Sequence, residues 1–400
     1  MISIDAALAL VKENALPVET ESIELMESGG RILAQSVTAP VDSPVYTNSA
    51  MDGYAVLWDD VKAVGPDHSV TLSIIGESQA GYPYPGEMGG GQAVQISTGA
   101  MVPSGCDAVI PIEDCLVKDK QVSIGSVRKQ NQHIRFRGEE FKVGFPLLDP
   151  GITIGSGQIA LLASMGIHHV EVYKRPKVAL IITGSELVAY DAIAESHQLR
   201  DSNRPMLAAA IQESGGIVSH QQRVEDNMQA TSRALEIAEA HADIIIFSGG
   251  VSVGPHDHVK DASLAAGYEQ LFWRVRQKPG KPLFFARKNN QVLLGLPGNP
   301  VSAYMCFKHY GSPLIQKMRG GQFSQVSTPA VLAREVSNPG DRASMVRVSL
   351  DPTEGELATA TVMAHQGSHM LSSISTAQGY FMLPENTIYP AQSVVAVYTF

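Results

Sequence analysis

The sequence predicts a mixed α/β protein of several domains, with a doubly wound α/β domain in its middle third and β-rich domains on either side. Three observations support this class. Strand-like runs alternate with helical segments across residues 177–318, as in a mostly parallel sheet with helices between its strands. Residues 45–140 are rich in glycine and proline, whereas residues 325–400 alternate apolar and polar positions. The length of 400 residues allows about two to four domains.

Periodicity and capping residues define the elements of the middle third. The predicted strands are residues 177–183, 217–224, 243–247 and 291–296. The first and last are continuous apolar runs, which are typical of a sheet covered on both faces. The predicted helices are residues 201–216, 227–241, 259–266 and 301–318. In such sheets ligands bind beyond the carboxyl ends of the strands, and the loops described below follow strands of this kind.

The flanking segments show β patterns. Short strand-like runs occur at residues 69–75 and 92–96 in the first flank, and at residues 343–350 and 393–398 in the second. The alternation in the second flank fits a small antiparallel barrel or a sandwich. A linker is expected near residues 318–324, where two glycines interrupt the pattern.

Composition excludes several classes of function. The chain is 44% hydrophobic and 18% charged, which is typical of a globular protein, and its formal net charge is −10. Nucleic acids and membrane surfaces are polyanions that recruit basic faces, so neither is an expected partner. An anionic substrate would have to be held by a few local positive contacts.

The cysteines and the first residues indicate a soluble, cytoplasmic protein. Cys106, Cys115 and Cys306 are an odd number without zinc-ligand spacing, so we expect reduced thiols. The first ten residues lack a basic segment and carry Asp5 within their apolar run, unlike a signal peptide. No apolar run approaches the ~18 residues of a membrane span.

A glycine-rich loop over residues 248–254 follows the third predicted strand. Glycines at this point let backbone N–H groups approach an anion, and the next helix adds a partial positive charge at its N-terminus. Asp257 could bind a cation and Lys260 a phosphate, or the two could be a helix cap and a solvated charge. His256 and His258 resemble a metal pair, but adjacent side chains at this spacing point in different directions, so a transition-metal site is disfavoured.

A second loop, residues 296–302, follows the fourth predicted strand. Asn299 suits a helix N-cap, Pro300 suits the first helical position, and Ser302 lies in the first turn. A helix N-terminus of this kind, beside Gly298, binds oxyanions readily. The alternative is a well-capped helix without a ligand.

A pair of lysines flanks a Pro-Gly turn at residues 278–282. Both ammonium groups of Lys278 and Lys281 could converge on one tetrahedral anion. The alternative is a solvated hairpin tip.

Acidic residues follow successive strands of the predicted sheet. Glu186, Asp226 and Asp257 come after the first, second and third strands, and Asp52 lies in a separate motif near residue 50. Carboxylates beside an anion site repel the substrate unless a hard cation lies between them. Mg²⁺, which binds one or two carboxylates together with substrate phosphates, meets this need. Each acid taken alone is more often a cap or a surface charge, but the location that they share is hard to obtain by chance.

Taken together and in order, these motifs resemble the molybdopterin molybdenumtransferase family, the bacterial molybdenum insertases, which are related to the plant insertase and to the E domain of gephyrin. The resemblance covers essentially the whole chain. The segments that carry it are residues 48–55, 97–100, 183–187, 248–254, 278–282 and 296–302.

The resemblance implies a homodimer of four-domain subunits whose site is shared between the subunits. The implied domains are a molybdopterin-binding α/β domain (residues 1–18 and 175–322), a small linking domain (19–40 and 141–174), a β-rich domain (41–140) and a C-terminal β-barrel (323–400). The implied reaction inserts molybdate into adenylylated molybdopterin with Mg²⁺ and releases AMP. The implied partners are the molybdopterin adenylyltransferase and the proteins that accept the cofactor.

The resemblance also implies roles for individual residues. Positions that match the family's oxyanion pocket are Lys278, Lys281, Ser302, Arg347 and Ser368. Positions that match its acidic, catalytic cluster are Glu186, Asp226 and Asp257, also the implied Mg²⁺ ligands, with Asp52, Thr98 and Glu140 contributed by the second subunit. The implied contacts to the pterin phosphate come from Ser248, Gly249, Gly250, Gly254, Pro297, Gly298 and Asn299.

The chain departs from the family pattern in three places. Ser185 stands where an aspartate is usual, Glu140 replaces an aspartate and reaches one methylene further, and His256 and His258 flank Asp257. The first change removes a charge from the acidic cluster. Two other functions compete with the transferase: a pterin-nucleotide-binding scaffold that has lost turnover, and a nucleotide-sugar or phosphotransfer enzyme, although the chain has no Walker loop or GxGxxG run.

Overall fold

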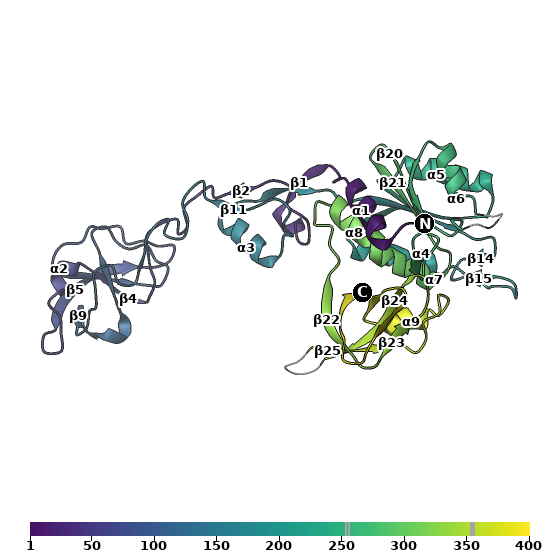
Figure 1. Ribbon diagram of the computed structural model, residues 1–400. Helices are drawn as coiled ribbons and strands as arrows, with labels where there is room; N and C mark the ends of the chain where they lie inside the picture. Colours follow the sequence, from purple (N-terminus) through teal and green to yellow (C-terminus); the bar gives the residue numbers. More distant parts are fainter. Residues whose placement is uncertain (253, 255–256, 353–356) are drawn as a thin grey trace. The chain divides into compact units, whose positions relative to one another are not determined.

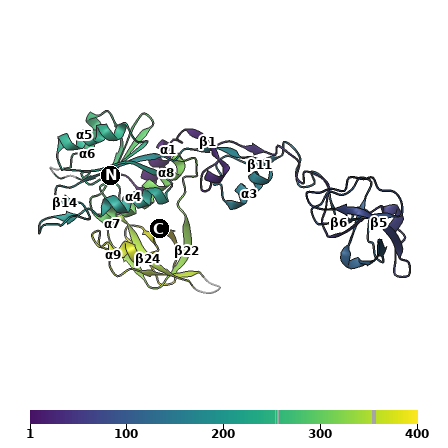
Figure 2. The same cartoon turned by 180° about the vertical axis from the view of Figure 1, so that it is seen from behind.

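The computed structural model describes residues 1–252, 254, 257–352 and 357–400. It divides into two compact units, each described by itself (Figures 1 and 2). The large unit comprises residues 1–34, 150–155 and 169–400, and the small unit comprises residues 35–149 and 156–168. None of the helices in these described ranges has the length and apolar character needed to cross a bilayer.

The large unit contains the predicted doubly wound sheet. Its six strands lie in the order β16 (Ile217–Val224), β13 (Lys177–Thr183), β17 (Ile244–Ser248), β21 (Gln291–Leu296), β20 (Phe284–Lys288) and β18 (Glu269–Trp273). The first four are parallel, which confirms the four strands expected from the sequence, and β20 and β18 extend the sheet antiparallel. The chain leaves β13 for β16 on one side and then crosses to β17 on the other. The strand order therefore reverses at β13, where sheets of this class bind ligands.

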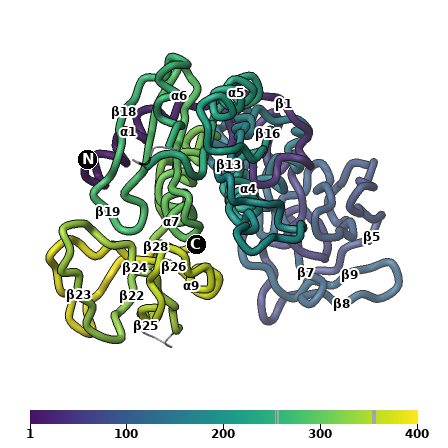
Figure 3. The backbone as a smooth tube through the Cα atoms, turned by 90° about the vertical axis from the view of Figure 1, so that its right-hand side faces the viewer, coloured from purple at the N-terminus to yellow at the C-terminus, as the bar shows by residue number. Residues whose placement is uncertain are grey.

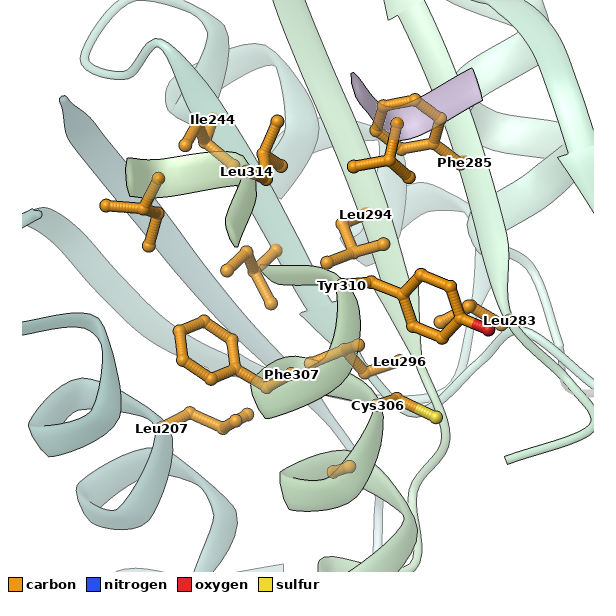
Figure 4. Packing of buried hydrophobic residues seen from close by; sticks show 14 of the residues in the cluster. Leu207, Ile244, Leu283, Phe285, Leu294, Leu296, Cys306, Phe307, Tyr310 and Leu314 are labelled. Carbon is orange, nitrogen blue, oxygen red and sulfur yellow. The ribbon is translucent and has the colours of Figure 1, made fainter. Parts of the chain in front are cut away.

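Helices cover both faces because alternate residues of each buried strand point to opposite sides. Leu180 and Ile182 of β13 pack in one apolar cluster with α1 (Ile4–Asn14), α4 (Asn203–Glu213), α7 (Pro300–Cys306) and α8 (Ser312–Met318). Ala179 and Ile181 pack in another with α5 (Met228–Glu239) and α6 (Val259–Ala265). Figure 4 shows residues of the first cluster, in which Leu294 and Leu296 of the sheet lie among Phe307, Tyr310 and Leu314 of the helix layer.

The single helix predicted over residues 301–318 is interrupted by a π-helical segment, Phe307–Gly311, between α7 and α8. Pro313 has no backbone N–H and so cannot donate to the carbonyl of His309 four residues earlier. The Gln325 side chain supplies a donor instead, with 2.6 Å between its Nε2 and the His309 carbonyl oxygen. The substitute donor explains how the helix continues past the proline without a buried unpaired carbonyl.

The C-terminal part is a closed barrel, one of the two alternatives left open by the alternating pattern (Figure 3). Its strands, in the order of pairing around the ring, are β24 (Ala343–Asp351), β25 (Ala358–Val362), β22 (Ser327–Leu332), β28 (Val394–Thr399) and β26 (Gly379–Leu383), which returns to β24. The expectation of a wholly antiparallel barrel is wrong, because β22 and β25 run parallel. The short strand β19 (Gln277–Lys278) joins β24 and attaches the barrel to the α/β domain.

The small unit is built on a second six-stranded sheet. Its order is β7 (Ala108–Pro111), β4 (Gly53–Val56), β6 (Gln92–Ile96), β5 (Val70–Ser78), β9 (Gln121–Ile124) and β8 (Cys115–Lys118). The unit also holds α2 (Trp58–Val61), α3 (Ser156–Ser164) and the pairs β2 (Val37–Thr38) with β11 (Pro146–Leu148) and β3 (Asn48–Ser49) with β10 (Ile134–Arg135). The short runs predicted at residues 69–75 and 92–96 are therefore strands of this sheet.

The remaining α-helix and strand pairs belong to the large unit. They are α9 (Ser372–Thr376) and the pairs β1 (Thr20–Glu24) with β12 (His169–Tyr173), β14 (Leu187–Val188) with β15 (Leu199–Arg200), and β23 (Val336–Asn338) with β27 (Thr387–Tyr389). The predicted linking domain thus contributes β1 and β12 to the large unit, and β2, β11 and α3 to the small one. The four predicted domain boundaries stay a prediction.

Candidate functional site

Four of the loops singled out in the sequence follow the parallel strands and so leave one edge of the sheet. The lysine turn is an exception to the expectation, because it lies between β19 and β20. Glu186 follows β13, Asp226 follows β16, and Asp257 follows β17. The loop after β21 carries Gly298 and Asn299. Since the four strands are parallel, their carboxyl ends lie at the same edge, and the common location predicted for these loops is confirmed.

Asn203, a residue that the sequence reasoning did not single out, ties two of these loops together. Its Nδ2 donates to Ser248 Oγ at 2.9 Å and to the carbonyl oxygen of Gly298 at 2.7 Å. Ser248 Oγ in turn donates to the carbonyl oxygen of Pro297 at 3.2 Å. Ser248 is fully buried, so its side chain holds the two loops together from within. The sequence indicated only that a helix starts here. The asparagine in the first turn of α4 was the one local signal that could have pointed to this role.

The glycines at residues 249 and 250 are needed for close packing as well as for conformation. Gly249 has φ of +97°, and a Cβ there would lie 2.5 Å from Thr183 Oγ1. Its N–H donates to the carbonyl oxygen of Leu296 at 3.0 Å, so this amide is used within the sheet. Gly250 also has a positive φ, +68°. Any side chain at residue 249 would push the loop away from β13.

The acidic residues are held by their own loops. Asp226 Oδ2 accepts from the Ser185 N–H at 2.9 Å, and the Asp226 N–H donates to Ser185 Oγ at 3.2 Å. Asp257 Oδ2 accepts from the Gly254 N–H at 2.6 Å, while His258, not Asp257, occupies the N-cap position of α6. Ser185, the departure from the family pattern, therefore fastens the end of β13 to the end of β16.

The structure does not by itself assemble a metal centre. Over the described ranges, no group of three or more His, Cys, Asp or Glu side chains is placed to hold a metal ion. Glu186 is exposed, and Asp226 and Asp257 are half-buried. The Mg²⁺ ligand set stays a prediction, and His256 lies outside the described residues.

A cavity of about 760 Å³ lies beside the lysine turn. Lys278 and Lys281 line it, both with exposed side chains, and Gly280 between them has φ of +88°. The opposite wall belongs to the C-terminal domain, including Gln366, Gly367 and Ser368. Of the five residues predicted for the oxyanion pocket, four line this single cavity: Lys278, Lys281, Ser302 and Ser368.

Arg347, the fifth, does not itself line the cavity, but it is hydrogen-bonded to Gln366 and Gly367, which do. Its side chain is fully buried, and its Nη2 donates to the carbonyl oxygens of His365 and Gly367, both at 3.3 Å. Its Nε and Nη1 have no hydrogen-bond partner among the described residues. Burial lowers the pKa of the guanidinium to about 10, which still leaves it charged at neutral pH. A buried cation with unpaired donors is costly unless an anion approaches it.

Gln366 and Ser368 complete the wall. The Gln366 side chain brackets Arg347, accepting from its N–H at 3.1 Å and donating to its carbonyl oxygen at 3.0 Å. The expectation that Asn299 occupies the N-cap position is confirmed, but its side chain does not cap the helix; its Nδ2 donates to Ser368 Oγ at 3.3 Å. The Val301 N–H donates to the Ser368 carbonyl oxygen at 3.2 Å, so the start of α7 is fastened to the C-terminal domain.

The remaining predicted residues belong to the small unit. Asp52 Oδ1 accepts from both the N–H and the Oγ1 of Thr98, at 2.7 and 3.1 Å. Glu140 Oε2 accepts from Ser43 Oγ at 2.6 Å. All three predicted residues, Asp52, Thr98 and Glu140, are exposed. The pairing of Asp52 with Thr98 brings together two residues that lie 46 positions apart.

Comparison with known proteins places the whole chain in one family. Residues 2–166 match the MoeA N-terminal region (domain I and II), residues 179–317 match a probable molybdopterin binding domain, and residues 329–400 match the MoeA C-terminal region (domain IV). The molybdopterin molybdenumtransferase of Haemophilus influenzae is 34% identical over 96% of this chain and 95% of its own length. That of Bacillus subtilis is 31% identical over 96% of this chain and 91% of its own.

A solved structure agrees with the sequence relatives. The molybdopterin biosynthesis moeA protein from Pyrococcus horikoshii OT3 superposes with a TM-score of 0.85 at 26% identity, over the full length of both chains. The scaffold and phosphotransfer alternatives are not favoured by any of these matches. The chain belongs to the molybdopterin molybdenumtransferase family.

Proposed function

We propose that this protein works in the cytoplasm, in molybdenum cofactor biosynthesis, and inserts molybdate into adenylylated molybdopterin with release of AMP. The buried Arg347 beside the lysine-lined cavity carries the proposal. Molybdate is a tetrahedral dianion that requires several converging donors. Lys278, Lys281 and Arg347 offer positive charge, and Ser302 and Ser368 offer hydroxyl donors. An acidic chain with net charge −10 that lines one cavity with Lys278, Lys281 and Arg342, and buries Arg347 next to that lining, is suited to a small dianion.

The adenylylated pterin would lie along the edge of the sheet next to this cavity. The loops after β17 and β21, joined by Asn203, would present backbone to the pterin phosphate. The two dithiolene sulfurs would replace oxygens of molybdate, which leave as water, while water attacks the phosphoanhydride bond and separates AMP from the pterin phosphate. We assign the protein mainly a positioning role without a covalent intermediate.

The donor set at the sheet edge fits Mg²⁺. Glu186, Asp226 and Asp257 offer only carboxylate oxygens, and Mg²⁺ needs just one or two of them because substrate phosphates and water supply its other ligands. When bound, the ion would neutralise charge on the phosphoanhydride. The Gly254 N–H orients the carboxylate of Asp257, and the Ser185 N–H orients that of Asp226.

The site would be completed by a second copy of the chain. Asp52 and Thr98, joined by hydrogen bonds, and Glu140 are exposed on the small unit, where a second subunit's crevice could receive them. The molybdopterin adenylyltransferase would supply the substrate, and acceptor enzymes would take the product.

Incubation of the purified protein with adenylylated molybdopterin, Mg²⁺ and molybdate tests the proposal. We expect AMP release coupled to cofactor formation, and loss of both in a Lys278→Ala/Lys281→Ala variant. Lys288→Ala is the matched control, because Lys288 ends β20 at the opposite edge of the sheet and pairs with Glu239. Tight pterin binding without AMP release would overturn the enzyme and leave a scaffold.

A further inference from the structure

Gln277 is the residue before the lysine turn, and its side-chain amide is fully buried. Its side-chain hydrogen bonds go to the turn and to the residues that pack against the turn. Its Nε2 donates to the carbonyl oxygen of Gly280 at 3.0 Å, bridging the turn from its first strand residue to its apex. Its Oε1 accepts from Tyr310 Oη at 2.6 Å. Burying an amide is unfavourable unless it is bonded, and these bonds satisfy it.

The group that holds Gln277 is rigid. Tyr310 is fully buried and lies in the π-helical segment, in the apolar cluster under the sheet (Figure 4). On the other side, β19 pairs in parallel with β24, so that Gln277 is opposite Ala343 and Lys278 is opposite Ser344. Gln277 thus connects three parts of the large unit: the lysine turn, the helix layer and the barrel.

The turn has no room to sink toward the helix layer. A Cβ built on Gly280 would lie 2.1 Å from Cys306 Sγ and 2.9 Å from Gln277 Nε2. The Gln277 amide also donates to Cys306 Sγ at 3.3 Å. The close packing of Cys306 and the hydrogen bond to the Gly280 carbonyl oxygen therefore fix the position of the turn relative to the helix layer.

We propose that Gln277, held by Tyr310, is a positioning residue that fixes the spacing of Lys278 and Lys281 and thereby sets the affinity and selectivity of the cavity for a tetrahedral oxyanion. The inference rests on the proposed function, since it concerns the same cavity. Lysine is a flexible, strongly hydrated point charge, so two lysines choose one anion over another only if their backbone is fixed. Preorganising that backbone lowers the entropy lost on binding.

Two variants test the role. Gln277→Met keeps the approximate volume but removes all three side-chain hydrogen bonds, and Tyr310→Phe removes only the hydroxyl that holds the amide. We expect about tenfold weaker molybdate binding for Gln277→Met by titration calorimetry, and a smaller loss for Tyr310→Phe. The ratio of molybdate to sulfate affinity should fall in both variants. The double variant should bind no more weakly than Gln277→Met, because the two residues act as one unit.

The chain provides a matched control. Tyr268 Oη donates to Gln291 Oε1, and Gln291 Nε2 donates to the carbonyl oxygens of Glu239 and Ala242, away from the cavity at the start of β21. Tyr268→Phe and Gln291→Met should lower the melting temperature without changing molybdate affinity or the sulfate ratio. The comparison separates a general loss of stability from a loss of positioning.

The possible outcomes are distinct. Wild-type affinity and selectivity in Gln277→Met and Tyr310→Phe would overturn the inference while leaving the proposed function intact. Equal losses of affinity in the control pair would overturn it too, by showing that stability alone matters. If the wild-type protein binds no molybdate, the proposed function fails and the inference fails with it. Should Gln277→Met not fold, Tyr310→Phe decides the question alone.

Discussion

Arg347 is unusual at the scale of single residues, because a fully buried guanidinium with two nitrogens that have no partner in the described part of the chain weakens a fold instead of stabilising it. Such a residue is expected where binding, not stability, requires it.

The Arg347→Met variant tests this view. We expect its free energy of unfolding to stay within about 1 kcal/mol of the wild type, because the lost bonds to two carbonyls are offset by removal of a buried charge. Molybdate affinity should fall about 10- to 100-fold, the loss of one or two charged hydrogen bonds. Denaturant unfolding and titration calorimetry measure the two effects. A large loss of stability with unchanged affinity would make Arg347 a structural residue.

At Asp257 the effect of the carboxylate charge on turnover can be measured separately from the effect of its hydrogen bond on stability. Its Oδ2 accepts from the Gly254 N–H, and the amide oxygen of an asparagine can take over that bond. Asp257→Asn should therefore unfold within about 0.5 kcal/mol of the wild type, yet turnover should fall at least about tenfold because the carboxylate charge is lost. Asp257→Ala is the comparison, and it should lose stability as well. Equal losses of stability and turnover in Asp257→Asn would identify a loop cap.

At the scale of elements, the π-helical segment joins the α/β domain to the barrel through His309. Its Nδ1 lies 2.7 Å from Tyr380 Oη of β26, and its Nε2 has no partner among the described residues. Burial lowers the pKa of His309 from 6.5 to about 4. Between these values the unfolded chain binds a proton that the folded protein does not, so stability falls as the pH falls from 6.5 to 4.

We expect His309 to account for about 2–3 kcal/mol of stability lost between pH 7 and pH 4. The His309→Gln variant removes the titrating group and should show a correspondingly flatter pH dependence. Denaturant unfolding of both proteins at several pH values measures this effect. The carboxylates contribute equally to the pH dependence of both proteins, so their contribution cancels in the difference. Parallel curves for the two proteins would show that His309 does not contribute.

An element could be predicted from the sequence where neighbouring residues determine it, and not where distant residues do. The four parallel strands, the helix starts and the glycine loops follow from apolar runs and capping residues, which are local signals. The π-helical segment depends on Pro313 and on Gln325, which lies beyond the end of α8. The parallel pairing of β22 with β25 depends on closure of the barrel, which alternation alone does not specify.

The site divides in the same way. The lysines and acids were predicted because charged residues in glycine-rich motifs are visible in a sequence. Asn203 and Gln277 were missed because each is a single buried amide whose partners lie far along the chain or in another element. The full burial of Arg347 also depends on the folded barrel. Polar residues that support a site from within therefore need the structure to be found.

At the scale of the whole molecule, the proposed shared site would take Asp257 and Asp52 from two different chains. Asp257 belongs to the large unit and Asp52 to the small one. If the small unit serves a second copy of the chain, neither residue completes a site without a partner subunit. A complementation experiment can distinguish that arrangement from a site formed within one chain.

The experiment mixes two variants, Asp52→Asn and Asp257→Asn, each of which should be strongly impaired as a homodimer. In a heterodimer of the two, a shared site would combine the intact Asp257 of one chain with the intact Asp52 of the other. Random mixing should then restore about a quarter of the wild-type activity, because half of the dimers are mixed and each has one intact site. If each chain forms its own site, every site carries one substitution and mixing restores nothing. AMP release from the randomly mixed dimers of the two co-expressed variants measures the difference, with each homodimer as its control.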